Sequence, residues 1–177
     1  GKNVIFGFIL AGVLVPGVIL AIPQFLMLSA AGMANTYWSV LLPQLITPYG
    51  IYLARVYAAA SIPTEMIEAA RTDGSGEFRI FRSIALPMMV PGLITIFLFQ
   101  FVAIWNNFML PYIMLGDDEL FPLTVGMQSL VAVGTGNAPQ FTLVVMGALF
   151  SILPIVLLFL VLQRYWRTDL AAGAVKV

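Results

Sequence analysis

Charged side chains are concentrated in one short stretch of this 177-residue chain. The stretch between Pro63 and Pro91 carries seven charges, although charged residues make up only 9% of the whole chain. Histidine and cysteine are absent from the sequence, which excludes disulfides, thiolate chemistry and the commonest metal-ligand clusters. The apolar runs also contain no pair of carboxylates for acid–base work, so an embedded enzyme is not indicated. These charges are suited to binding a partner in water.

The residues around these charges predict a helix, a tight turn and a second helix. Ser61 can cap a helix that accepts Pro63 in its first turn, where the missing N–H costs nothing. Gly74 permits the positive φ that turns the chain sharply. A second helix is predicted from Glu77 to Ile84, and Leu86-Pro87 is expected to end it.

The order of residues in this stretch matches a docking motif. Glu68-Ala69-Ala70, Gly74 and Ile84-Ala85-Leu86-Pro87 stand at the spacing found in binding-protein-dependent ABC importers, so the chain resembles an importer permease. The resemblance implies that a cytoplasmic loop at 61–87 binds an ATPase subunit; the alternative is an ordinary solvated loop. The coupling residues that it implies are Glu68, Ala69, Ala70, Asp73, Gly74, Ile84, Leu86 and Pro87.

Composition independently indicates a membrane protein. Hydrophobic residues make up 61% of the chain, more than a soluble core of this length needs. The formal net charge of zero argues against a nucleic-acid partner, which would require a basic face. We therefore expect an all-α membrane protein, a polytopic bundle of transmembrane helices of the importer type with a cytoplasmic pair of coupling helices.

Charge-free runs place four spans. A helix needs roughly 20 apolar residues to cross about 30 Å of hydrocarbon. The runs predict spans at about residues 4–29, 38–57, 90–115 and 141–162, within one transporter domain covering 1–177. Permeases of the family that the chain resembles usually place more helices before the docking loop. We therefore expect one or two N-terminal helices to be missing from this chain.

The basic residues predict the orientation. All eight fall on one side of the predicted spans, which the positive-inside rule assigns to the cytoplasm. The chain is thus expected to be a multi-pass protein in contact with lipid, with both of its ends inside, and the resemblance to importer permeases implies a bacterial or archaeal cytoplasmic membrane. Arg79 and Arg82 have two readings, since they either follow this rule alone or take part in docking.

Two further groups of polar residues are candidate binding sites. Gln100 and Asn107 share a face of the third span beside Asn106, where amides suit sugar hydroxyls and Trp105 can stack on a pyranose ring. The alternative is that these amides join helices across a dimer interface. The external segment offers possible contacts for a binding protein, or a polar cap, at Asp117, Asp118, Glu119, Gly134, Gly136 and Asn137.

Weaker motifs narrow the resemblance to the carbohydrate-uptake branch. Asn35-Thr36-Tyr37-Trp38, Trp105-Asn106-Asn107-Phe108 and the tail at 170–176 look like those of the smaller permease subunit of maltose-type importers. The resemblance implies ATP-driven sugar import by alternating access, with a separate ATPase dimer, a second related permease and an extracytoplasmic sugar-binding protein. It favours a heterodimer of permeases.

The chain lacks a Gly-x-x-x-x-Gly-Lys loop, so ATP and Mg are expected on the partner ATPase, with no cofactor or metal in this chain. An importer permease for another solute, such as glycerol phosphate or an amino acid, stays open as an alternative. A membrane scaffold without transport activity is a second alternative.

Overall fold

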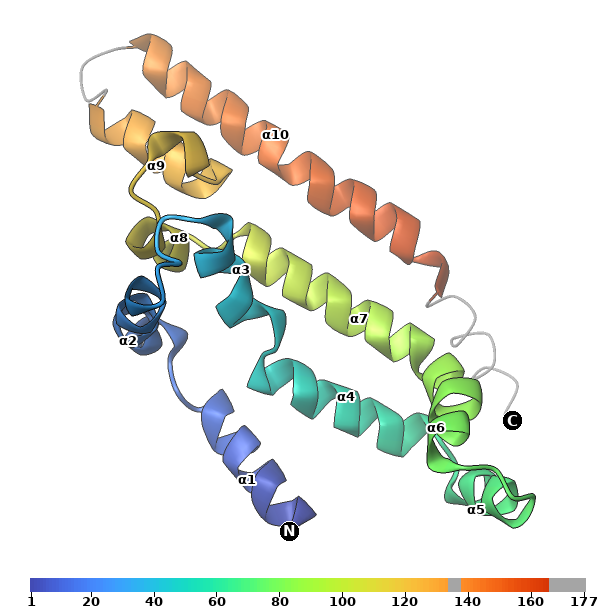
Figure 1. The fold of residues 1–177 in the computed structure, drawn as a ribbon. Coiled ribbons are helices and arrows are strands. Elements are labelled where there is room, and N and C mark those ends of the chain that lie inside the picture. Colours follow the sequence, from blue (N-terminus) through green and yellow to red (C-terminus); the bar gives the residue numbers. More distant parts are fainter. Residues whose placement is uncertain (134–137, 166–177) are drawn as a thin grey trace.

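The computed structural model describes residues 1–133 and 138–165, and this part of the chain is helical without strands (Figure 1). The prediction of an all-α protein is confirmed. In chain order, the elements are α1 Lys2–Val13, α2 Gly17–Ala30, α3 Tyr37–Leu45, α4 Pro48–Ser61, α5 Thr64–Thr72, α6 Glu77–Ile80, the π-helical segment η1 Phe81–Ala85, α7 Leu86–Trp105, α8 Met109–Met114, the 3-10 segment η2 Asp118–Leu120, α9 Leu123–Val133 and α10 Ala138–Leu162.

Breaks divide three of the four stretches that the sequence predicts as spans. The stretch 4–29 consists of α1 and α2, whose axes are bent by 102°. The residue before a proline is pushed toward extended backbone, and Pro16, itself extended at ψ 124°, precedes the first residue of α2. The stretch 38–57 is interrupted between α3 and α4, where Thr47 caps α4 by accepting a hydrogen bond from the Gly50 N–H at 3.1 Å.

The prediction of one helix over 90–115 is wrong, because α7 ends at Trp105. The Asn106 amide donates to the Val102 carbonyl at 2.9 Å, and the Asn107 side-chain oxygen accepts from the Leu110 N–H at 3.3 Å. Asparagine side chains that bond to nearby backbone compete with the helical ladder. Residues up to 114 therefore form the separate helix α8.

The prediction that Leu86-Pro87 ends the second loop helix is also wrong. That helix begins at Glu77 and runs through η1 into α7 without a stop, as 29 continuous residues to Trp105. Pro87 cannot donate to a helical ladder, but the wider turn of η1 lies immediately before it, where the Leu86 N–H donates to the Phe81 carbonyl. The docking stretch and the membrane helix are therefore one rod.

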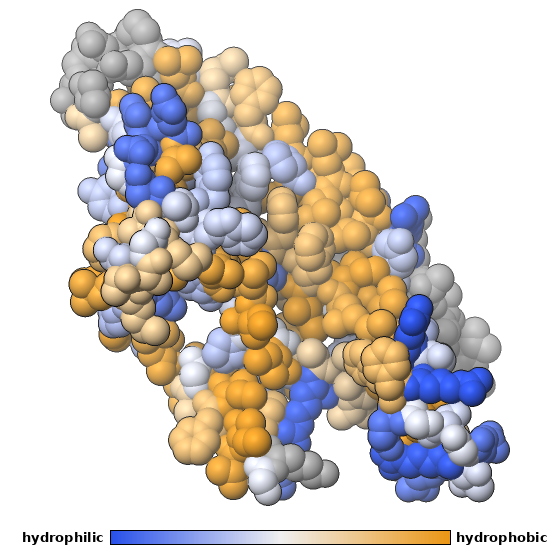
Figure 2. Space-filling view, viewed as in Figure 1, coloured by the Kyte–Doolittle hydropathy of each residue, from blue (hydrophilic) through white to orange (hydrophobic). Residues whose placement is uncertain are grey.

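Two described helices are long and apolar enough to cross a membrane, Glu77–Trp105 and Phe141–Leu162, and the bent pair α1–α2 makes a third if it counts as one span. The division into four spans stays a prediction. Figure 2 shows apolar surface over most of the visible face, with hydrophilic residues gathered over α5 and α6 at one end and near α8 and α9 at the other.

The buried core is small and lies where α2, α3 and α8 meet. Ala21, Leu110, Met114 and Leu115 are buried together, with half-buried residues such as Phe25 packed around them. Elsewhere α4 packs between α1 and α7, and α10 packs on α7 and α9. Most large apolar side chains on these helices stay exposed, which is expected where lipid or another membrane subunit covers them.

The close approach of α4 and α7 depends on Gly92. A Cβ atom at this buried position would overlap the ring of Tyr57 on α4. We expect Gly92→Ala to lower the unfolding free energy by about 1–3 kcal/mol through overpacking, measured as the midpoint of thermal unfolding in detergent. Gly126→Ala on α9 is the matched control, because no atom lies within 4 Å of its added Cβ. Equal midpoints for the two variants would contradict this account of the packing.

Candidate functional site

The turn between α5 and α6 is fixed by a complete helix C-cap. Gly74 has a φ of +77°, which confirms the predicted positive value. Its N–H donates to the Arg71 carbonyl at 3.0 Å, and the Ser75 N–H donates to the Ala70 carbonyl at 3.0 Å. This pair of bonds is the Schellman arrangement, which satisfies carbonyls at the helix end and favours glycine at the left-handed position.

The start of α5 differs from the prediction. Ser61 is the last residue of α4 and does not cap α5; the N-cap is Pro63, whose ψ of 134° is extended. Pro63 therefore sets the angle between the two helices by its fixed φ. Glu65 lies in the first turn of α5 and Arg71 in its last turn, so each charge interacts favourably with its end of the helix dipole.

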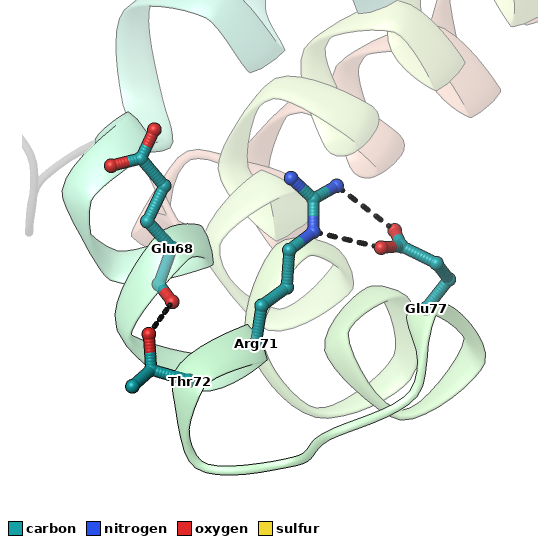
Figure 3. A network of polar contacts seen from close by, with 4 residues as sticks. All are labelled: Glu68, Arg71, Thr72 and Glu77. Carbon is teal, nitrogen blue, oxygen red and sulfur yellow. Dashed lines mark hydrogen bonds and ion pairs between the residues drawn. The ribbon is translucent and has the colours of Figure 1, made fainter.

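Arg71 and Glu77 join the two helices of the loop across the turn (Figure 3). The Arg71 Nε donates to one Glu77 oxygen at 2.8 Å and Nη2 donates to the other at 3.2 Å. The pKa of Arg71 is raised, chiefly by the hydrogen bond and the charge of Glu77. Both side chains are exposed, so the bidentate geometry contributes more to fixing the angle of the loop than to overall stability.

Glu68 and Ala69 are presented to solvent beside this fixed turn. In Figure 3 the Glu68 carboxylate points away from the Arg71–Glu77 pair. Within the described residues this carboxylate makes no hydrogen bond or ion pair. The Thr72 hydroxyl donates to the backbone carbonyl of Glu68 at 3.0 Å and leaves the carboxylate available. Ala69 is exposed, whereas Ala70 faces inward with 8% of its surface accessible. A partner can approach the Ala69 face closely, and Glu68 is available for a charge-assisted hydrogen bond.

The other predicted coupling residues lie at the edges of this surface. Asp73 is the exposed C-cap of α5. Ile84 is half-buried in η1, while Leu86 and Pro87 are exposed in the first turn of α7. The chain therefore brings Glu68, Ala69, Asp73 and Gly74 onto one small helix–turn unit and places the remaining three on the rod that follows it.

Two of the four predicted residues of the substrate path, Gln100 and Asn107, are joined by a network of amides around Gln44. The Gln100 Nε2 donates to the Gln44 backbone carbonyl at 2.7 Å, and the Asn107 Nδ2 donates to the Gln44 side-chain oxygen at 2.7 Å. The Thr47 hydroxyl donates to Gln100 at 3.1 Å. These bonds tie α7 to the break between α3 and α4, which supports the helix-joining alternative for Gln100 and Asn107.

A cavity of about 610 Å³ opens beside this network. Gln44, Gln100 and Trp105 line it together with mainly apolar residues such as Phe97 and Phe101. Asn106 and Asn107 do not line it. The Trp105 indole N–H donates to the Ser151 carbonyl of α10 at 3.0 Å, and its ring stacks on Phe101 with centroids 5.8 Å apart. The four predicted residues therefore do not form one binding surface.

At the opposite end of the molecule, the Asn35 side chain forms hydrogen bonds with Gly116 and Asp117, a contact that we call the Asn35 clasp. Asn35 has a φ of +57° and donates to the Asp117 carboxylate at 2.7 Å. Its side-chain oxygen accepts from the N–H groups of Gly116 and Asp117, and its own N–H donates to the Met114 carbonyl at 2.9 Å. Asp118 and Glu119 are exposed in η2. Gly134, Gly136 and Asn137 lie outside the described residues.

Sequence reasoning missed three of these residues, Gln44, Thr47 and Asn35, and one ion pair, Arg71–Glu77. Gln44 and Thr47 carried a signal, since an amide and a hydroxyl next to a proline inside an apolar run indicate a stabilised helix break. Asn35 tolerates a left-handed conformation, but its partner lies 82 residues away and no spacing indicates it. The Arg71–Glu77 pair depends on the geometry of the glycine turn.

These features define a polytopic helical membrane protein with a rigid helix–turn unit projecting from one end. Residues 1–168 match the family described as "Binding-protein-dependent transport system inner membrane component", and the chain belongs to this family.

Similar proteins include several sugar permeases. The chain is 35% identical to the arabinooligosaccharides transport system permease protein AraQ of Halalkalibacterium halodurans, over 99% of this chain and 62% of that protein. It is 33% identical to the melibiose/raffinose/stachyose import permease protein MelC of Bacillus subtilis, over 99% of this chain and 63% of that protein. The chain thus spans about three fifths of the length of these relatives.

A solved structure has a similar fold. It is described as a bacterial ABC transporter involved in the import of the acidic polysaccharide alginate. The match has a TM-score of 0.71 at 25% identity and covers 91% of this chain and 59% of that chain. The helical membrane fold predicted from the sequence is therefore that of an importer permease.

The turn after α5 should be sensitive to the residue at position 74. Any side chain at φ +77° is strained, so we expect Gly74→Ala to lower the unfolding free energy by about 1–2 kcal/mol, measured by thermal unfolding in detergent. Gly76→Ala is the control, because Gly76 has a φ of −69° and no atom within 4 Å of its added Cβ. A Gly74 variant as stable as the Gly76 variant would show that the turn tolerates another conformation.

Removal of the Asn35 side chain should loosen the end of the molecule that carries Asp117. Asn35→Ala deletes three hydrogen bonds and should cost about 1–3 kcal/mol in thermal unfolding experiments. Asn35→Gly removes the same bonds while keeping the backbone unstrained, and it should retain most of the loss. Asn106→Ala, which removes one bond to its own helix, is the control and should cost less. Similar losses at both positions would contradict the proposed role of the clasp.

Proposed function

We propose that this chain is the membrane-spanning permease subunit of an ATP-driven importer, coupled through the loop at 61–87 to a separate ATPase dimer. The observation that supports this most strongly is the exposed Glu68–Ala69 surface, held at a fixed angle by the Gly74 turn and the Arg71–Glu77 pair in a chain of the importer family. ATP and Mg bind to the ATPase in this proposal.

The continuous rod from α6 to α7 supplies the mechanical link. A push on the loop acts on Glu77, and the same helix ends at Trp105 beside the cavity. At 1.5 Å per residue the rod extends about 42 Å, so motion at the loop can reach the cavity end along one continuous helix. Alternating access requires such a stiff element between ATPase and membrane path.

The transported solute is proposed to be a sugar or oligosaccharide. Relatives similar along nearly all of this chain are named for arabinooligosaccharide and melibiose transport. The cavity also joins an aromatic ring at Trp105 with the amide of Gln100, and this combination suits a sugar, which has an apolar ring face and hydroxyl edges. Among the residues that the structure describes, the cavity lining contains no charged side chain, which disfavours an anionic solute such as glycerol phosphate.

The proposal includes two further partners. A second related permease, in a heterodimer, would cover part of the exposed apolar surface of the described helices. An extracytoplasmic sugar-binding protein would contact the end that carries Asp118 and Glu119, where the Asn35 clasp orders the backbone. The loop at 61–87 and both ends of the chain are then cytoplasmic.

The decisive experiment measures ATP hydrolysis by the assembled transporter in lipid, with and without sugar-loaded binding protein. We expect Glu68→Ala to weaken ATPase binding at least tenfold and to abolish the stimulation, because it removes a charged partner from a desolvated contact. Glu65→Ala is the matched control on the same helix, and it should keep stimulation within about twofold, as expected for a rim charge.

The outcomes separate the candidate functions. Loss of stimulation at Glu68 alone supports the coupled importer. Equal behaviour of the two glutamate variants would reject Glu68 as the coupling contact. Failure of the full-length protein to assemble with any ATPase would favour the scaffold alternative, whereas assembly with stimulation by a non-sugar solute would correct the substrate class.

A further inference from the structure

Two arginines on the rod lie outside the Glu68–Ala69 surface. Arg79 and Arg82 are exposed on the rod just before α7, and neither has a carboxylate within ion-pair distance in the described part of the chain. Glu77, the nearest acid in sequence, already accepts hydrogen bonds from Nε and Nη2 of Arg71. Each guanidinium is therefore available to an external anion.

Two aromatic side chains accompany these arginines. Phe78 is 75% exposed and Phe81 is 53% exposed. At about 100° per residue, Phe78, Arg79, Phe81 and Arg82 fall within an arc of about 160°. Ile80, which is 4% exposed, lies opposite the middle of this arc. One face of the rod thus carries two rings beside two cations, and Ile80 is buried behind it.

The depth of this face follows from the length of the helix. The 20 residues of α7, Leu86–Trp105, cover about 30 Å, the thickness of the hydrocarbon core. With Leu86 placed at the hydrocarbon boundary, the preceding turns at 77–85 project beyond it, so that Phe81 and Arg82 lie about 6–8 Å and Phe78 and Arg79 about 10–12 Å past it. The polar headgroup layer occupies about 5–8 Å on each side. Phe81 and Arg82 fall in this layer, where aromatic rings and arginines are favourable, and the long side chain of Arg79 can reach it by snorkelling.

We propose that Phe78, Arg79, Phe81 and Arg82 form a binding face for anionic phospholipid headgroups of the cytoplasmic leaflet. The guanidinium groups of Arg79 and Arg82 pair with lipid phosphates, the Phe81 ring lies in the headgroup layer and the Phe78 ring lies on its aqueous side. This contact anchors the coupling rod at the depth where it leaves the membrane, so the loop keeps its position when the ATPase pushes on it. The inference rests on the cytoplasmic placement of the loop in the proposed function.

The test uses the full-length protein in lipid nanodiscs without any ATPase. The present chain has no cysteine, so Ser83→Cys, exposed beside Arg82, can carry a fluorophore whose quenching by brominated lipids reports local lipid. We expect brominated phosphatidylglycerol to quench more than brominated phosphatidylcholine. The double variant Arg79→Gln and Arg82→Gln should lower the relative affinity for phosphatidylglycerol by about fivefold per arginine, whereas the double lysine variant should retain the preference.

A reporter at Ala132→Cys, exposed on α9 at the far end of the molecule (Figure 1), should show no such dependence on Arg79 and Arg82. An unchanged preference for phosphatidylglycerol in the glutamine variant would overturn the proposal. ATPase binding is then measured separately in pure phosphatidylcholine. A glutamine variant that keeps its lipid preference but loses the ATPase would assign the two arginines to docking, whereas failure of the coupling proposal alone would leave the lipid result intact.

Discussion

The cost of leaving backbone polar groups unsatisfied in hydrocarbon constrains the rest of this structure. Each free N–H or C=O costs several kcal/mol there, so a helix can break only where side chains replace the lost bonds. At the break between α3 and α4, Thr47 accepts from the Gly50 N–H and Gln100 donates to the Gln44 carbonyl. After α7, the Asn106 side-chain amide donates to the Val102 carbonyl, and the Asn107 side-chain oxygen accepts from the Leu110 N–H. Polar residues in the apolar runs thus maintain the architecture first, and only Gln100 and Trp105 of the predicted substrate set also line the cavity.

The loop at 61–87 lies at the other end of the molecule, and in our proposal it must keep its shape in water. A helix pair this short has little apolar surface to bury, with Ala70 and Ile80 as its buried residues. Its shape is therefore held by directional contacts, namely the C-cap at Gly74 and the bidentate bridge between Arg71 and Glu77. These contacts leave Glu68 and Ala69 free, and the rod that follows connects them to the cavity.

Both ends of the molecule are thus held by directional polar contacts. Asn35 fixes the segment around Asp117 with side-chain and backbone hydrogen bonds, and the C-cap of α5 together with one ion pair fixes the loop at 61–87. Between them the helices bury few side chains and expose many apolar ones. In our proposal, a partner subunit and lipid cover these exposed side chains.

The sequence by itself determined the all-α membrane class, the family motif, the positive φ at Gly74 and the approximate position of α5, because these depend on composition and on local backbone preferences. Tertiary structure decided where the helices break and continue. Leu86-Pro87 reads as a stop, yet the π-helical turn before it lets the helix continue, whereas 90–115 reads as one helix and is divided by two asparagines. It also decided that Gln100 and Asn107 meet through Gln44 and that Asn35 meets Asp117, since contacts between residues 50 or more positions apart follow from packing and not from spacing.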